Sequence, residues 1–235
     1  LSGAIFRFPI GMLTDKFGGK VIFTSLLLFC SIPMFLLSYA NDYAVFVLLS
    51  FIFGLTGASF ACGIAFTSLW FPKNKQGTAL GLFGVGNIGT AFTALFTPRL
   101  LVYLTDNGTN PEGWRSVPQI YAAALLVMGI LFFLFTTNKI PETKKTVKEL
   151  LHPLKEVRLW RFGLYYFLVF GCFVAFSQWL ISYYVNAYYM SLITAGFLTS
   201  LFSMPASLIR AFGGWLADKF GARKVMYYVF SASTF

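Results

Sequence analysis

One motif occurs twice in this chain, first as Arg7-Phe8-Pro9-Ile10-Gly11-Met12-Leu13-Thr14-Asp15-Lys16-Phe17-Gly18 and again as Arg210-Ala211-Phe212-Gly213-Gly214-Trp215-Leu216-Ala217-Asp218-Lys219-Phe220-Gly221. The two copies share arginine, glycine, leucine, aspartate, lysine, phenylalanine and a final glycine at the same offsets. In each copy the arginine lies in an otherwise apolar run, eight residues before the aspartate. This internal repeat predicts two pseudo-symmetric halves, each with an arginine inside a helix.

The composition indicates an all-α membrane protein. Hydrophobic residues make up 57% of the 235 residues and charged residues only 11%, whereas a soluble domain carries about 25% charged residues. Six apolar stretches are long enough to span a bilayer, at 21–40, 43–71, 77–104, 118–137, 161–187 and 190–217. Two shorter apolar pieces, 1–13 and 225–235, are expected to belong to helices that continue beyond this sequence.

The net charge of +10 encodes orientation rather than an affinity for nucleic acid. Basic residues gather in alternate loops and in the hydrophilic segment 138–160, whereas the intervening loops have few. This positive-inside pattern predicts that the repeated loops and segment 138–160 are cytoplasmic, in a plasma (inner) membrane protein. An affinity for anionic lipid headgroups is a lesser possibility. Segment 138–160 is the predicted linker between an N-terminal bundle, 1–137, and a C-terminal bundle, 161–235.

The two repeated arginines are the main candidates for a binding site. At about 1.5 Å per residue, each lies about 12 Å from its loop, near the middle of a ~30 Å hydrocarbon layer. A cation there costs at least a few kcal/mol and is usually functional. All eight acidic residues lie in predicted loops or at helix ends, so a bound anion is the expected partner. The alternative is that each arginine snorkels or pairs with an acid elsewhere in the protein.

A glycine-rich span is the second candidate for the site. Its glycines at 77, 81, 84, 86 and 89 permit close helix packing or a backbone exposed to a substrate. Asn87 lies about 15 Å from the preceding loop and Phe60 about 16 Å from the following one, so both reach the depth of the arginines. An amide, an aromatic face and two guanidiniums together suit a flat monovalent anion.

The repeated loop predicts a conformational latch. Its predicted members are Gly11, Asp15, Gly18, Gly214, Asp218 and Gly221. The first glycine of each copy lets a neighbouring helix approach, and the last one allows a tight turn. Each aspartate can accept hydrogen bonds from a nearby helix N-terminus or pair with a basic residue.

These motifs resemble those of the nitrate/nitrite porter family of the major facilitator superfamily. The resemblance rests on Arg-x-Pro-x-Gly-x-Leu-x-Asp at 7–15, Phe-Pro-Lys-x-x-Gln-Gly-x-Ala-Leu-Gly at 71–81 and Gly-x-Gly-Asn-x-Gly at 84–89. It implies a major-facilitator-type helical bundle, of which this chain is expected to be a fragment covering roughly helices 2 to 9 of 12. It also implies that Arg7, Arg210, Asn87, Phe60 and Tyr166 contact the substrate. Tyr166 lies only about 8 Å into its helix if that helix begins at Arg161.

The resemblance implies a secondary active transporter, expected to be a monomer, that moves nitrate and/or nitrite by alternating access. Other readings of the same residues are a carrier of another small anion such as a carboxylate, a proton-coupled nitrate symporter, a sensor and an anion channel. No acid pair, metal cluster or nucleophile–base pair is visible, so neither an enzyme nor a cofactor is expected. The scattered Cys30, Cys62 and Cys172 suggest no metal site or disulfide.

Overall fold

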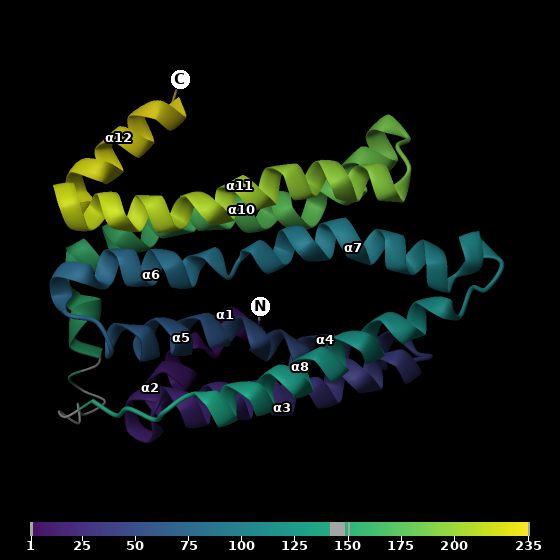
Figure 1. The fold of residues 1–235 in the computed structure, drawn as a ribbon, viewed down its shortest axis with the longest axis horizontal. Coiled ribbons are helices and arrows are strands. Elements are labelled where there is room, and N and C mark those ends of the chain that lie inside the picture. The colour runs from purple at the N-terminus through teal and green to yellow at the C-terminus, as the bar shows by residue number, and fades with distance from the viewer. Residues whose placement is uncertain (1, 142–148, 150, 235) are drawn as a thin grey trace. The chain divides into compact units, whose positions relative to one another are not determined.

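The computed structural model of the protein describes residues 2–141, 149 and 151–234, and this part of the chain contains helices and no strand (Figure 1). The α-helices are α1 (Ser2–Ile5), α2 (Arg7–Phe17), α3 (Gly19–Leu36), α4 (Tyr43–Phe53), α5 (Ser59–Ser68), α6 (Gln76–Val85), α7 (Ile88–Leu104), α8 (Ser116–Phe135), α10 (Val157–Tyr188), α11 (Leu192–Phe220) and α12 (Ala222–Thr234). Short 3-10 turns connect several of them: η1 (Leu37–Tyr39), η2 (Gly54–Ala58), η3 (Lys73–Lys75), η4 (Asp106–Gly108), η5 (Gly113–Arg115) and η6 (His152–Lys155).

The predicted spans are confirmed. Within the described residues, six helical segments are long and apolar enough to cross a membrane: Gly19–Tyr39, Tyr43–Ser68, Lys73–Leu104, Gly113–Phe135, Val157–Tyr188 and Leu192–Phe220. Each overlaps one of the stretches identified from the sequence. The two shorter apolar pieces are also helical, the first in α1 and α2 and the second in α12.

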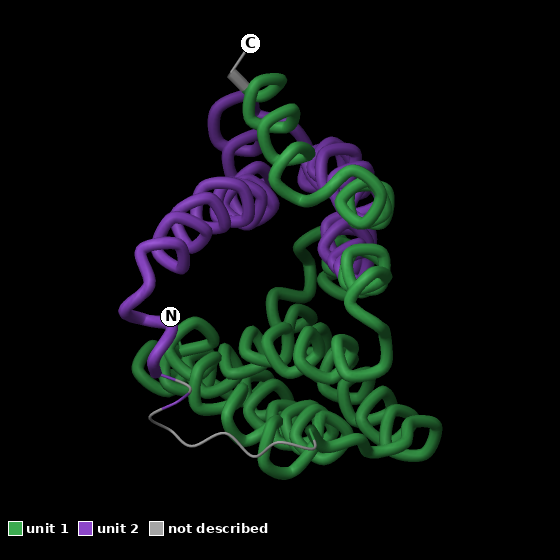
Figure 2. The backbone as a smooth tube through the Cα atoms, turned by 90° about the vertical axis from the view of Figure 1, so that its left-hand side faces the viewer, with its two compact units in different colours: residues 1–83, 100–142, 211–235 green, residues 84–99, 143–210 purple. Residues whose placement is uncertain are grey.

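Contacts divide the chain into two compact units (Figure 2). Unit 1 consists of residues 1–83, 100–142 and 211–235. In it, α3 lies along α8, and α2 packs against α5. Phe132 of α8 joins three helices, because its ring centroid lies 4.7 Å from that of Phe23 in α3 and 6.0 Å from that of Phe66 in α5. Aromatic contacts of this kind replace the hydrophobic effect, which does not hold helices together in lipid.

Unit 2 consists of residues 84–99 and 143–210. The part of α11 in this unit, residues 192–210, buries the polar residues Thr199, Ser203 and Ser207. Each hydroxyl donates a hydrogen bond of 2.8–2.9 Å to the carbonyl oxygen four residues earlier, so burial leaves no donor unsatisfied. On the same helix, a Cβ added to Gly196 would lie 2.7 Å from Cγ of Pro98 in α7. Small residues therefore allow α11 and α7 to pack closely.

The two units group residues by contact and do not follow the predicted bundles 1–137 and 161–235. That division, with its linker at 138–160, stays a prediction. Residues 142–148 and 150 of the predicted linker lie outside the described part of the chain.

The start of segment 138–160 closes two helix ends in unit 1. The amide of Asn138 donates a 3.0 Å hydrogen bond to the carbonyl oxygen of Phe17, the last residue of α2. Lys139 donates a 2.7 Å hydrogen bond to the carbonyl of Leu69, directly after α5. These side chains satisfy carbonyls that a helix end leaves without an intrahelical partner. Gly18, between α2 and α3, has φ +89° and lies against Asn138.

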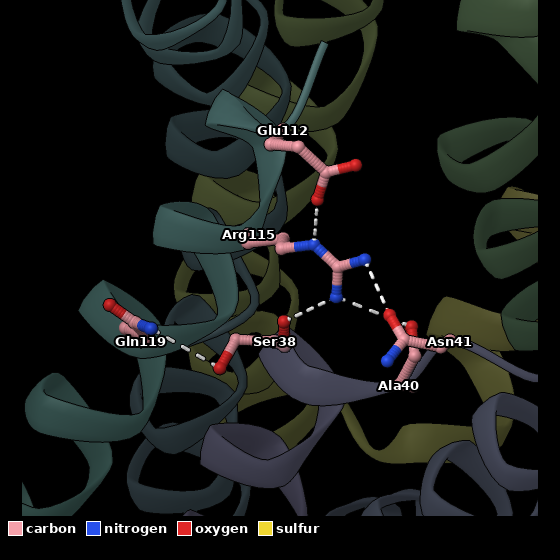
Figure 3. A network of polar contacts seen from close by, with 6 residues as sticks. All are labelled: Ser38, Ala40, Asn41, Glu112, Arg115 and Gln119. Carbon is pink, nitrogen blue, oxygen red and sulfur yellow. Dashed lines mark hydrogen bonds and ion pairs between the residues drawn. The ribbon is translucent and has the colours of Figure 1, made fainter.

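Arg115 joins two loops at the other end of unit 1 (Figure 3). It forms an ion pair with Glu112 and donates hydrogen bonds of 2.7 Å to the carbonyl of Ser38 and 2.8 Å to the side-chain oxygen of Asn41. Gln119 adds a 3.2 Å hydrogen bond to the hydroxyl of Ser38. The single basic residue of loop 105–117 therefore has a structural role, which accounts for its place outside the predicted cytoplasmic loops.

We expect three glycine-to-alanine variants to separate backbone strain from steric conflict. Gly11→Ala should be neutral, because no atom lies within 4 Å of the added Cβ. Gly221→Ala, at φ +87° in open space, should cost about 1–2 kcal/mol of unfolding free energy. Gly18→Ala should cost more, because its Cβ would also displace Asn138 and break a hydrogen bond worth about 0.5–1.5 kcal/mol. Thermal unfolding of the purified protein in detergent measures the order, and equal stability of the Gly18 and Gly11 variants would contradict it.

Candidate anion-binding site and helix interlock

Arg7 is the first residue of α2 and is half-buried, with its Nε atom fully enclosed. Its guanidinium carbon lies 6.0 Å from the ring centroid of Phe60, near the start of α5. The Phe60 ring is itself 5.5 Å from that of Phe83 in α6. Unit 1 therefore brings together two predicted site residues, Arg7 and Phe60, in cation–π contact.

Arg210 lies in α11 and is held by two aromatic rings of α10. Its guanidinium carbon is 5.4 Å from the ring centroid of Phe170 and 4.8 Å from that of Phe173. Gly84 of α6 packs against the arginine stem, because a Cβ added there would lie 3.2 Å from Cδ of Arg210. The lack of a side chain at Gly84 thus makes room for the guanidinium arm.

Tyr166 belongs to the same surroundings. The centroid of its ring lies 4.9 Å from that of Phe170, with an interplanar angle of 11°. Tyr166 also lies close enough to Arg210 for their charges to interact. Because α10 begins at Val157 and not at Arg161, Tyr166 lies about 14 Å along the helix rather than about 8 Å. The depth of Tyr166 in the membrane stays a prediction, because a helix can begin before the hydrocarbon layer does.

Asn87 occupies the break between α6 and α7. Its backbone N–H and its side-chain amide donate hydrogen bonds of 3.1 and 3.0 Å to the carbonyl of Gly84. An asparagine amide has two N–H groups, so one hydrogen remains for a ligand after this bond. Gly84 therefore links Asn87 to Arg210, since it bonds the first and contacts the stem of the second.

The structure thus places the predicted substrate residues in two groups. Arg7 and Phe60 meet in unit 1, and Arg210, Tyr166 and Asn87 gather in unit 2 around Phe170 and Gly84. Their joint role in binding one anion stays a prediction. Phe173 and Phe170 were not expected from the sequence, because nothing distinguishes them among 29 phenylalanines.

Asp218, near the end of α11, accepts three hydrogen bonds from the start of α6. The backbone N–H of Gly77 donates at 2.8 Å, and the backbone N–H and hydroxyl of Thr78 donate at 2.6 and 2.7 Å. A carboxylate at a helix N-terminus also interacts favourably with the helix dipole. Of the two alternatives for Asp218, the helix N-terminus is therefore confirmed. We call Gly77, Thr78 and Asp218 the α6–α11 interlock.

Glycines make this close approach possible. A Cβ on Gly77 would lie 2.7 Å from the carbonyl oxygen of Gly214, and a Cβ on Gly214 would lie 3.0 Å from Cα of Gly81. The expected close approach is thus present at Gly214, whereas Gly11 has open space around it. In the described part of the chain, Asp15 accepts no comparable set of hydrogen bonds. The tight turns are seen at Gly18 and Gly221, whose φ values are +89° and +87°.

Comparison of the sequence with models of known protein families identifies the superfamily of the chain. The family model of the Major Facilitator Superfamily matches residues 1–235. The chain therefore belongs to the Major Facilitator Superfamily, and its apolar helices are those of an integral, multi-pass membrane protein.

Curated relatives narrow the class. The chain is 44% identical to a probable nitrate/nitrite antiporter of Thermus thermophilus, over 98% of this chain and 53% of that protein. It is 32% identical to a nitrite extrusion protein of Bacillus subtilis, over 99% and 57%. It is also 32% identical to a probable nitrate transporter of Staphylococcus epidermidis, over 94% and 55%. The chain spans about half the length of the curated relatives it matches.

The resemblance to nitrate/nitrite porters that the motifs predicted is confirmed by these relatives. Their names describe a transporter, an antiporter and an extrusion protein. They agree with the expectation of a carrier rather than an enzyme.

We predict that Asp218→Asn loosens the start of α6. The amide loses the negative charge and one acceptor oxygen, so the N–H group of either Gly77 or Thr78 loses its partner and the other bond is weakened. Hydrogen–deuterium exchange of peptides covering 74–82 should become faster. Thr78→Val, which removes one of the three hydrogen bonds, should give a smaller increase, and Thr78→Ser none. Unchanged exchange in Asp218→Asn would show that the interlock does not hold α6.

Proposed function

We propose that the full-length protein carries nitrate, nitrite or both across the membrane by alternating access, with one anion held between Arg7 and Arg210. The observation that carries this proposal is the matched setting of the two arginines. Each occupies the same place in the repeat, lies in an apolar helix and has its guanidinium against a phenylalanine ring. The names of the curated relatives support nitrate and nitrite as the substrates.

The aromatic setting suits recognition of a flat oxyanion. A ring beneath a guanidinium attracts the cation and leaves the N–H groups at the guanidinium edge able to donate. A planar anion can accept two of these parallel hydrogen bonds from each arginine. The second N–H of the Asn87 amide would add a neutral donor on the Gly84 side of Arg210, and the Phe170 ring over the guanidinium is itself stacked on Tyr166.

We propose exchange of nitrate for nitrite as the mode of transport. The predicted spans hold no aspartate, glutamate or histidine near their middle, so proton coupling through a side chain of these helices is not expected. In an empty site the two half-buried guanidiniums lack the charge of the anion, which raises the free energy of the unloaded carrier and slows its return. The interlock, and by the repeat its counterpart at Asp15, would open and close as the halves rock. The repeated loops face the cytoplasm of an inner-membrane monomer in this account.

Replacing either arginine by lysine should abolish most nitrate transport. Lysine keeps the charge but loses the planar fork, and hydrogen bonds to charged groups are worth about 1.5–3 kcal/mol, so uptake should fall roughly tenfold or more. Initial rates in proteoliposomes measure the effect on Arg7→Lys and Arg210→Lys. Arg99→Lys is the matched control, because Arg99 is exposed and bonds only the carbonyl of Leu95 among the described residues. A near wild-type rate for either site variant would remove that arginine from the site.

Exchange also predicts a strict dependence on internal anion. Sealed vesicles containing nitrite should take up external nitrate rapidly, whereas empty vesicles under an imposed proton gradient should take up little. Competition by small carboxylates should be weak if the site is built for nitrate. Strong gradient-driven uptake into empty vesicles would favour proton symport, and strong competition by carboxylates would favour a different anion.

A further inference from the structure

A pocket of about 460 Å³ lies beside the α6–α11 interlock, entirely within unit 1. Its walls come from the start of the α6 span and the end of α11. They include Asn74, Lys75, Leu82, Trp215, Asp218 and Lys219. The proposed anion site at Arg7 and Arg210 uses none of these residues, so the pocket is separate from that site.

The pocket carries a net positive charge, because its walls include Lys75 and Lys219 but, among the described residues, only one acid, Asp218. Lys75 and Lys219 are both exposed, and within the described residues neither takes part in an ion pair. Asp218 is the acid in the pocket wall, and its two oxygens already accept the three hydrogen bonds of the interlock. Two ammonium groups, one from each side of the pocket, are therefore available to an anionic ligand.

The same pocket has an apolar side. Leu82, about two helical turns further along α6, is 65% exposed, and the indole of Trp215 is 44% exposed. Lys219 lies over the Trp215 ring, with Nζ 5.0 Å from the centroid. Tryptophan with lysine is the pair of side chains that anchors helices at a membrane surface. A soluble anion would fill the charged side and leave this apolar side bare.

We propose that the pocket binds an anionic phospholipid of the leaflet that the repeated loops face. The lipid phosphate lies between Lys75 and Lys219 and accepts a hydrogen bond from the amide of Asn74, and an acyl chain runs along Leu82 and Trp215. Basic residues at a membrane surface each contribute attraction to anionic lipid. Because one lysine comes from each segment joined by the interlock, the bound lipid stabilises the closed interlock by linkage.

The binding test uses native mass spectrometry of the purified full-length protein with phosphatidylglycerol and, separately, phosphatidylcholine. Wild type should retain phosphatidylglycerol in preference to phosphatidylcholine. The double variant Lys75→Gln/Lys219→Gln should bind phosphatidylglycerol about tenfold more weakly or worse. Lys155→Gln/Lys224→Gln is the matched control, because it removes the same charge from residues outside the pocket and should stay within about twofold of wild type.

The linkage is tested by hydrogen–deuterium exchange of peptides 74–82 in nanodiscs of either lipid. Phosphatidylglycerol should slow exchange in wild type and have no effect in the pocket double variant. Equal retention of both lipids, or an equal loss in the control double variant, would overturn the pocket as a specific site. Complete displacement of the lipid by soluble glycerol phosphate at the same concentration would show that the ligand is a free phosphate and not a lipid.

Discussion

Hydrocarbon supplies no hydrogen bonds, so each polar group in these helices has to find its partner inside the protein. The hydroxyls of Thr14, Thr199, Ser203 and Ser207 bond the carbonyl one turn earlier, which lets them be buried at the small-residue seams. At the helix ends the same demand is met over long sequence distances. Asp218 bonds the start of α6, Asn138 bonds the end of α2, and Arg115 bonds carbonyls in and directly after η1. These long-range pairings hold helix ends together within unit 1.

Arg115 lies against the Trp114 ring, as the two repeated arginines lie against phenylalanine rings, and it also clamps two loops. Arg115 donates to backbone carbonyls, to an amide oxygen and to Glu112, so its role is structural. Arg210 is bounded by the faces of Phe170 and Phe173 and by the bare backbone of Gly84, and Arg7 faces Phe60. Aromatic faces attract a cation without accepting all its N–H groups. We assign a clamp to Arg115 because its donors bond loop acceptors, and we propose substrate binding for Arg7 and Arg210 because they occupy matched places in the repeat.

The spans could be predicted from the sequence because apolar runs of about 20 residues leave few alternatives. The repeat likewise predicted the turns at Gly18 and Gly221, and it gave contact with a helix N-terminus as one of two alternatives for Asp218. The partner of Asp218 could not be predicted, because Thr78 lies 140 residues away in sequence and only tertiary packing joins them. The sequence also placed the start of α10 too late, at Arg161, since Arg158 follows directly on the charged segment and made 157–160 resemble its end. The contacts of Phe170 and Phe173 with Arg210 could not be predicted, because nothing in the sequence distinguishes these two among 29 phenylalanines.

The central claim is that Arg7 and Arg210 hold the same anion, and a double-mutant cycle on nitrate binding tests it most directly. Nitrate affinity is measured by calorimetry for the full-length protein, Arg7→Lys, Arg210→Lys and the double variant. If both guanidiniums bind one anion, the losses of binding free energy are coupled. The loss in the double variant then deviates from the sum of the losses in the two single variants by about 0.5–3 kcal/mol. Losses that add to within about 0.5 kcal/mol would mean that the two arginines act independently and that no single anion lies between them.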